Sequence, residues 1–209
     1  NRQILVALSG LVMGMFVAVL SGTVVSTSLP RIISDLNGDQ TAYTWVITAS
    51  LLATAVSTPI WGKLSDLLDR KLLLQLSLIL FVVGTAIAGF AQDTTMLIAL
   101  RVVQGIGAGG LMSLVFVAIA LIISPRERGK YMGLVGGVMS LATIGGPLIG
   151  GVLTDAFGWR ANFFVGIPFA IAAIIIIQKT LHLPRSTRTS VSIDYLGAAL
   201  IAAGVSLLL

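Results

Sequence analysis

Long apolar stretches alternate with short charged ones along the whole chain. A helix needs about 20 residues, at about 1.5 Å each, to cross the roughly 30 Å hydrocarbon core of a bilayer. Six stretches reach that length, near Ile4–Leu29, Tyr43–Trp61, Leu72–Ala91, Thr95–Ile123, Tyr131–Leu153 and Asn162–Leu181. These runs are too long for barrel strands and do not alternate as barrel strands do. The pattern predicts an all-α, polytopic bundle of transmembrane helices.

The six spans form one predicted unit, residues 1–181, which a linker at 182–194 follows. A further apolar run begins at Tyr195, so 195–209 is expected to be the truncated start of a seventh transmembrane helix. The sequence starts without Met and stops inside this run. We therefore expect a fragment, the amino-terminal half of a longer protein. The first run is too long for the apolar core of a signal peptide and is read as a span.

Composition supports lipid as the solvent of this chain. Hydrophobic residues make up 56% of it and charged residues 10%, and the mean hydropathy is +1.03. The net charge of +5 is scattered between apolar runs, which argues against nucleic acid as a partner. Cysteine is absent and His182 is the one histidine, so we expect no metal site and no cofactor. The spans carry no cluster of His, Asp or Glu, which speaks against a membrane-embedded enzyme.

The basic residues predict the orientation. If the amino terminus is cytoplasmic, ten of the thirteen Lys and Arg fall in inner connections, Arg31 and Arg160 fall in outer ones, and Arg101 lies within a span. The positive-inside rule then predicts a multi-pass protein of the plasma membrane, with both ends of the fragment cytoplasmic. Four aromatic residues near predicted span ends are expected to be interfacial anchors: Tyr43, Trp45, Trp61 and Trp159.

A short repeat links the two halves of the fragment. The segment from Gly62 to Asp66 follows the second span, and the similar segment from Gly151 to Asp155 follows the fifth, 89 residues later. Three spans separate the copies, so one copy lies inside and the other outside. The sequence therefore predicts two three-helix repeats that are inverted in the membrane, the architecture of many transporters. A chance match in a biased sequence is the alternative.

Five motifs lie on this frame. The loop after span two carries Gly62, Asp66, Arg70 and Lys71, with Asp69 before Arg70; span four carries Arg101, Gln104 and Gly105; span five carries Gly133, Gly146, Pro147, Gly150 and Gly151. Span one carries Ser21 and Thr23, and span two begins with Trp45 and Thr48. In this order the motifs resemble those of the major facilitator superfamily, in its fourteen-span drug:proton antiporter branch. The resemblance covers nearly the whole chain.

Four positions depart from the family's motifs. Asp69 and Ala142 stand where the family usually has Gly, and Ser50 stands where it often has Tyr. Ser21 occupies the place of an Asp that family members use for cation recognition or proton coupling. This half therefore lacks that carboxylate.

The resemblance implies roles for these residues. Gly62, Asp66, Arg70 and Lys71 would form a conformational latch, for which a solvated basic loop is the alternative. Arg101, Gln104 and Gly105 would serve coupling and the cavity, although Arg101 snorkelling outward or pairing with Asp93 is also open. The span-five glycines would seal a smooth helix contact or simply pack. Ser21, Thr23, Trp45 and Thr48 are candidates for a substrate cavity, with bonding of the hydroxyls to the backbone as the alternative.

Together these features predict a secondary active transporter that exports drugs or other small amphipathic molecules by alternating access. The proton gradient, rather than a cofactor, would supply the energy. Its partners would be the lipid bilayer, a small-molecule substrate, protons and the missing carboxy-terminal half. A dedicated exporter of one metabolite, peptide or siderophore, a passive channel and a membrane scaffold remain as alternatives.

Overall fold

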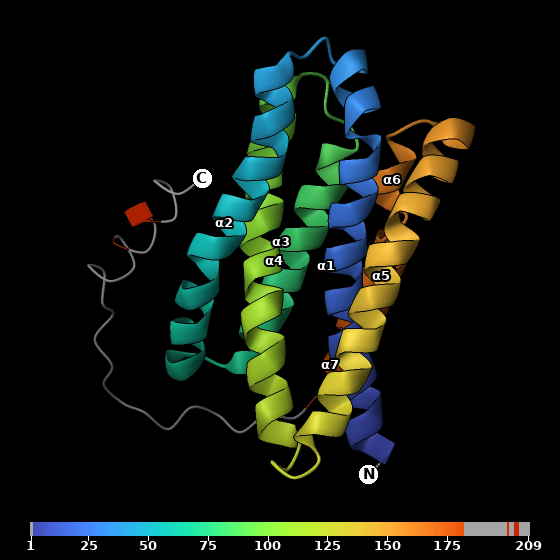
Figure 1. The fold of residues 1–209 in the computed structure, drawn as a ribbon. Helices are drawn as coiled ribbons and strands as arrows, with labels where there is room; N and C mark the ends of the chain where they lie inside the picture. The colour runs from blue at the N-terminus through green and yellow to red at the C-terminus, as the bar shows by residue number, and fades with distance from the viewer. Residues whose placement is uncertain (1, 182–199, 201–202, 205–209) are drawn as a thin grey trace.

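The computed structural model describes residues 2–181, 200 and 203–204 (Figure 1). Its helices are α1 (Arg2–Asp35), α2 (Gln40–Leu67), α3 (Arg70–Ala88), α4 (Thr94–Ile122), α5 (Arg128–Phe157), α6 (Ala161–Phe164) and α7 (Ile167–Thr180). Six segments are long and apolar enough to span a membrane, with α6 and α7 together forming the sixth. The predicted spans are confirmed. The predicted linker and seventh helix lie outside the described residues, apart from 200 and 203–204.

Aspartates begin three of the helices. Asp39, Asp69 and Asp93 precede α2, α3 and α4, and in each case the side chain accepts the backbone N–H of the residue three positions later. Such a cap satisfies an amide that the helix itself leaves unpaired. Asp69 has φ −63°, so the loop after α2 does not need the glycine that the family usually has there. The loop ends in a helix cap instead.

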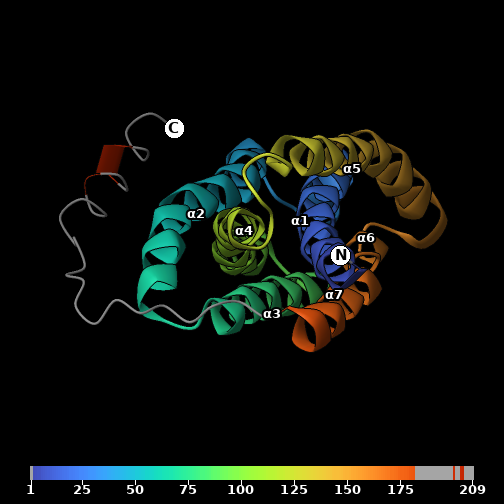
Figure 2. The same ribbon diagram turned by 90° about the horizontal axis from the view of Figure 1, so that it is seen from below.

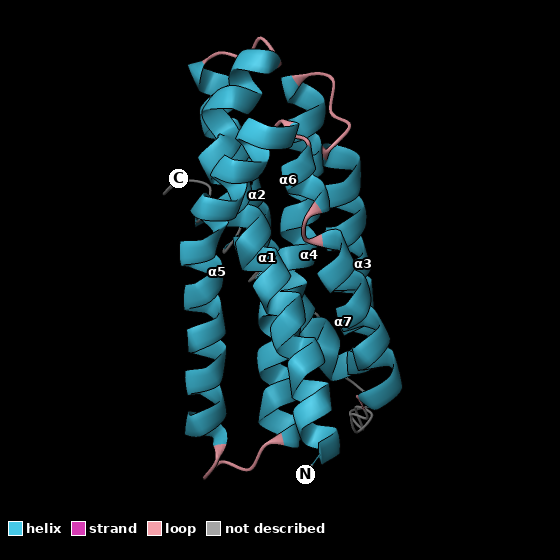
Figure 3. Ribbon diagram, turned by 90° about the vertical axis from the view of Figure 1, so that its right-hand side faces the viewer, coloured by secondary structure: helices cyan, strands magenta, loops and turns pink. Residues whose placement is uncertain are grey.

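The helices run alternately up and down. We call the end of the bundle where α1 begins, at the bottom of Figure 1, the lower end, and the opposite end the upper end. Helices α1, α3 and α5 run toward the upper end, and α2, α4 and α7 run toward the lower end (Figure 1). Figure 3 shows the connections at these two ends, apart from the short one between α6 and α7, with no strand among the described residues. The first triplet, α1 to α3, therefore runs in the opposite direction to the second triplet, α4 to α7.

The packing follows the same inversion. In the view from below, α4 and α1 lie centrally (Figure 2). Helix α4 packs mainly against α2 and α3, while α1 packs mainly against α5 and α7. Exchanging α1 with α4, α2 with α5 and α3 with α6–α7 leaves this pattern unchanged. The predicted pair of inverted three-helix repeats is thereby confirmed.

Two apolar grooves extend the repeat to individual residues. One groove, of about 570 Å³, lies along α2 and α4, and the other, of about 390 Å³, lies along α1, α5 and α7. Four pairs of lining residues are related by the 89-residue offset: Trp45 and Leu134, Ala49 and Val138, Ile98 and Ser9, Val102 and Met13. The 89-residue offset found in the loop motif therefore also relates the residues that line the two grooves. A chance match in the loop motif does not explain this agreement.

Two tryptophans lie elsewhere than predicted. Trp61 and Trp159 are only 8% and 2% exposed, so the expectation that they anchor the protein at the bilayer interface is wrong. The indole N–H of Trp61 donates to the carbonyl of Ile106 at 2.9 Å, which ties α2 to α4. Trp45, by contrast, is half exposed at the rim of the α2–α4 groove. Burial of an indole requires such a partner for its N–H.

Candidate functional site

A polar network crosses the apolar interior at the level of Arg101. The Arg101 Nε donates to the carbonyl of Val46 at 3.3 Å, and its Nη1 donates to the Gln104 side-chain oxygen. The Gln104 amide nitrogen donates in turn to Ser21 Oγ at 3.0 Å and to Thr85 Oγ1 at 2.8 Å. All four of these polar side chains are buried. The network therefore joins α1, α2, α3 and α4 through one amide and one guanidinium.

The depth of Arg101 sets the energetic problem. It lies seven residues into α4, about 10 Å along the axis. A guanidinium at that depth is expensive unless it faces a partner or a cavity. The side chain is 6% exposed, so it does not snorkel to the surface. Asp93 is not its partner, because the Asp93 carboxylate caps α4 through the N–H of Met96.

A cavity of about 230 Å³ lies against this network. Helices α1, α2, α3 and α4 all contribute to its wall. Its polar lining comes from Ser26, Ser50, Thr54, Arg101 and Gln104. Apolar side chains line the rest, so the cavity has the composition of a site for an amphipathic molecule.

The four candidates for the cavity have separate places. Ser21 lies in the network itself, and Thr23 donates to carbonyls of its own helix and, at 3.3 Å, to that of Ala142 on α5. Trp45 lines the α2–α4 groove rather than the cavity, and Thr48 is half-buried and lines neither. The geometry joins only Ser21 to Arg101 and Gln104. Ser26, Ser50 and Thr54 line the cavity in their place.

Gly105 is where α2 and α4 approach most closely beside the network. A Cβ placed on Gly105 would lie 2.5 Å from the carbonyl oxygen of Ser50, which no methyl group tolerates. The absence of a side chain there brings the α2 backbone within reach of α4. The Thr54 hydroxyl then lies between the two helices, with the carbonyl oxygens of Ser50 at 2.8 Å and Gly105 at 3.1 Å as acceptors that share its one proton.

The span-five motif divides into packed and open positions. A Cβ on Gly146 would lie 1.9 Å from Thr23 Oγ1, and one on Gly150 would lie 3.0 Å from the carbonyl oxygen of Val24. These two glycines therefore form the contact between α5 and α1. Gly133 and Gly151 have no atom within 4 Å of such a Cβ, and Pro147 is exposed. The buried Ala142 shows that a methyl group fits where the family has its second Gly.

The loop motif gathers at the lower end. Arg70 Nη2 lies 3.9 Å from an Asp66 carboxylate oxygen, and Lys71 Nζ donates to the carbonyl of Gln178 on α7 at 2.6 Å. Asp66 keeps about half of its side chain exposed. A Cβ on Gly62 would lie 3.1 Å from Ser113 Oγ of α4. The four latch candidates thus lie together and tie α2 and α3 to α4 and α7.

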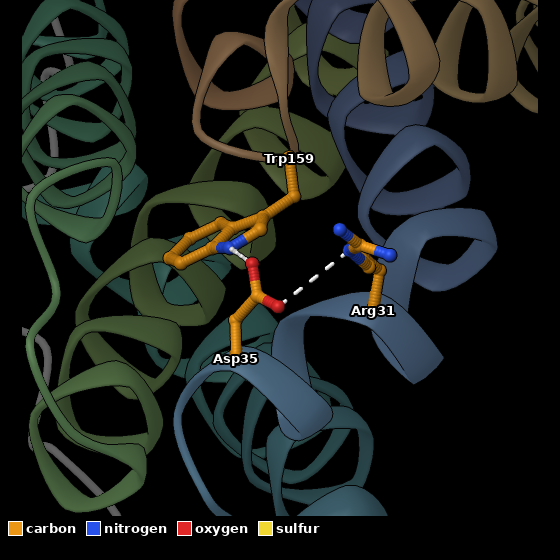
Figure 4. Close-up of polar contacts among 3 residues, drawn as sticks. All are labelled: Arg31, Asp35 and Trp159. Carbon is orange, nitrogen blue, oxygen red and sulfur yellow. Dashed lines mark hydrogen bonds and ion pairs between the residues drawn. The ribbon is translucent and has the colours of Figure 1, made fainter.

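A second polar cluster, which the sequence motifs did not predict, lies at the upper end. The Trp159 indole N–H donates to Asp35 Oδ2 at 3.1 Å, and Arg31 Nε lies 3.5 Å from Asp35 Oδ1 (Figure 4). The Arg160 guanidinium stacks 4.2 Å from the centre of the Trp159 ring and donates to the carbonyl of Ala91. The cluster joins the first triplet to the second. In the sequence, this cluster is visible only as Trp159 followed directly by Arg160, an aromatic residue next to a basic one.

Asn162 lies just below that cluster and is almost completely buried. Its amide nitrogen donates to Ser28 Oγ at 2.9 Å and Thr154 Oγ1 at 2.7 Å, which links α6 to α1 and α5. Nothing among the described residues gathers three His, Cys, Asp or Glu side chains as a metal would require. The polar groups of this chain therefore connect helices and line a cavity.

Comparison with known proteins agrees with this geometry. The family model described as Major Facilitator Superfamily matches residues 11–206. The chain is 36% identical over 202 residues to the multidrug transporter protein MdtP of Bacillus subtilis, a match that covers 97% of this chain and 37% of that protein. It is 38% identical over 212 residues to the efflux pump dotC of Dothistroma septosporum, covering 99% of this chain and 36% of the pump.

A solved structure shares the fold. The crystal structure of a bacterial homologue of the human lysosomal transporter Spinster superposes with a TM-score of 0.76 at 19% identity, covering 94% of this chain and 47% of that one. The chain spans little more than a third of the length of the curated relatives it matches. The family and the fold are those of membrane transporters and not of enzymes. The chain belongs to the Major Facilitator Superfamily.

Proposed function

We propose that this chain is the amino-terminal half of a secondary active transporter that exports small amphipathic molecules by alternating access, driven by the proton gradient. The observation that carries the proposal is the placement of the Arg101–Gln104 network. It is buried within spanning helices, and Arg101 and Gln104 line a cavity formed by α1, α2, α3 and α4. The names of two relatives, a multidrug transporter and an efflux pump, support export.

The lower end would face the cytoplasm. Lys63, Arg70, Lys71 and Lys179 lie there, together with Arg126 in the α4–α5 connection and Arg128 and Lys130 in the first turn of α5. Arg31 and Arg160 are the cations of the upper end within the described ranges. The positive-inside rule favours this orientation in the plasma membrane. Both ends of the fragment would then be cytoplasmic, and the missing half would close the cavity from the other side.

Three groups of residues would divide the work. Asp66, with Arg70 and Lys71, would hold one conformational state at the cytoplasmic end, since its exposed carboxylate is able to exchange partners as the halves rock. Arg101 and Gln104 would shape the cavity. Arg101 stays protonated, so it would tune an acid elsewhere rather than carry the proton itself. The α1–α5 contact at Gly146 would exclude water beside the path.

Uphill transport tests the proposal. The complete protein, in inside-out vesicles, is expected to accumulate at least one fluorescent amphipathic compound against its concentration gradient when the lumen is acidic. A protonophore should abolish that accumulation. Movement that only equilibrates the substrate would indicate a passive channel, and no movement of any compound in a broad efflux panel would favour a scaffold. Transport confined to one metabolite, peptide or siderophore would identify a dedicated exporter.

A further inference from the structure

The charge of Arg101 has no opposite charge beside it. Its two hydrogen-bond acceptors are the Val46 carbonyl and the Gln104 amide oxygen, which are neutral. A guanidinium carries five N–H donors, so these contacts leave several of them unused. Among the described residues no carboxylate lies within ion-pair distance of Arg101. The cavity therefore contains a fixed positive charge that is solvated only by dipoles.

Three aspartates at the upper end of the bundle have partners of their own. Asp93 lies eight residues before Arg101, about 12 Å along α4, and caps that helix. Asp39 caps α2 in the same way, and Asp35 binds the Trp159 indole and Arg31 at the upper end. These three carboxylates have partners that hold them away from the cavity.

The remaining polar lining adds no negative charge. Ser21 meets the network as a neutral hydroxyl, 3.0 Å from the Gln104 amide nitrogen. Ser26, Ser50 and Thr54 present further hydroxyl groups, and hydroxyls accommodate either sign of charge. Among the described residues that line the cavity, Arg101 is therefore the one that carries a charge.

The apolar lining defines the rest of the ligand. Ile47, Leu51, Phe81, Ala108 and Met112 complete the wall of the cavity. They suit an apolar body of modest size, since the part of the cavity formed by this half is about 230 Å³. A ligand with an apolar body and an anionic group at one end would place the body against the apolar wall and the anionic group beside Arg101.

We infer that the cavity binds the carboxylate of an amphipathic anion, with the Arg101 guanidinium as its counter-charge and the Ile47, Leu51, Phe81 and Met112 side chains around its apolar body. This inference rests on the proposed transport function and names the charge class of its substrate. The physical reason is that a buried cation gains most from an ionised acceptor, because charge-assisted hydrogen bonds are about twice as strong as neutral ones. A cationic substrate would instead meet repulsion in a medium of low dielectric constant.

Three probes that share a dansyl-labelled apolar chain and differ only in their terminal group test the inference: dansyl-labelled octanoate, its primary amide and the corresponding octylamine. The complete protein in inside-out vesicles is expected to take up the carboxylate with a KM at least about ten-fold lower than that of the amide, the ratio expected of one charge-assisted hydrogen bond. The amine should be the poorest of the three. Uptake of the amine equal to or better than that of the carboxylate would overturn the inference while leaving proton-driven export intact.

Ser21→Asp sharpens the test. It places a carboxylate against Gln104 and beside Arg101, and is expected to remove the preference for the anion and to improve amine uptake. Ser21→Asn is the matched neutral control, for which any loss of rate should fall on all three probes alike. An unchanged anion preference in Ser21→Asp would contradict the assigned role of Arg101.

Binding separates this inference from the transport proposal. The dansyl fluorescence of the same probes, measured with the complete protein in detergent, reports binding without transport. Tighter binding of the carboxylate, lost in Arg101→Gln and retained in part in Arg101→Lys, would support the anion site even if no uphill transport occurs. Equal binding of all three probes would overturn it.

Discussion

Gly146→Ala is the substitution whose outcome the packing determines most sharply. The added Cβ would lie 1.9 Å from Thr23 Oγ1 and 2.6 Å from Thr23 Cβ, both on α1. Rotation of the threonine side chain can move the hydroxyl, which has carbonyls of its own helix and that of Ala142 within hydrogen-bond distance, but it cannot move the Cβ. Helices α1 and α5 must therefore separate. Overpacking of this kind costs about 1–3 kcal/mol of unfolding free energy.

The measurement is the thermal stability of the purified complete protein, followed by tryptophan fluorescence. At about 2–4 °C per kcal/mol, Gly146→Ala is expected to lower Tm by several degrees. Gly133→Ala on the same helix is the matched control, because its Cβ meets no atom within 4 Å. It should leave Tm unchanged or raise it slightly, since Ala favours helix over Gly.

A second variant isolates the contact. Thr23→Ala removes the oxygen at 1.9 Å but leaves the Cβ at 2.6 Å, so in the Gly146→Ala background it should restore part of the lost stability. Equal Tm values for Gly146→Ala and Gly133→Ala would refute the reasoning. That result would mean that α1 and α5 do not pack as described.

Three further predictions concern the polar groups. Asp66→Asn should abolish export while leaving membrane insertion intact, because it removes the charge that pairs with Arg70; near-normal efflux in vesicle assays would remove Asp66 from the latch. Arg101→Ala should likewise abolish export, and Arg101→Lys should retain a fraction of it, since the charge remains but the planar fork is lost; normal rates in Arg101→Ala would exclude a role in the path. Trp159→Phe should lower the unfolding free energy by about 1 kcal/mol, because it loses the hydrogen bond to Asp35. Trp45→Phe, at a half-exposed site, should be nearly neutral in the same melting assay. Equal changes of stability in the two variants would contradict the burial of Trp159.

Hydropathy alone predicted the spans, and it did so because lipid imposes one constraint on every spanning segment: a run of apolar residues long enough to pair its own backbone. The ends were less accurate. Helix α1 continues six residues beyond Leu29 to Asp35, where Arg31 and Asp35 form an ion pair one turn apart. Charges at the end of a span look like a loop in a hydropathy pattern, although they extend the helix.

The site was predictable where a residue contrasts with its surroundings. Arg101 stands out because a cation in an apolar run has an energetic cost that demands an explanation. Thr85 does not, since a single hydroxyl within a helix usually bonds to its own backbone, and only the approach of α4 gives it the Gln104 amide.

Equal sequence signals also concealed different roles. Gly133 and Gly146 belong to one motif, yet only Gly146 touches another helix. Trp159 was expected at the interface because it adjoins a loop, but Asp35, 124 residues earlier, holds it inside. Which of several similar residues is packed depends on neighbours that are distant in the chain.

Accessibility of Ser50→Cys tests alternating access most directly. Ser50 lines the cavity beside Arg101, and this chain has no cysteine of its own. In the complete protein freed of any other cysteine, a membrane-impermeant maleimide should label Ser50→Cys from either face, with the balance shifted by the proton gradient, while Val83→Cys, exposed on the outer side of α3, stays unlabelled. Labelling from one face only, or from both faces regardless of the gradient, would contradict a path that opens alternately to the two sides.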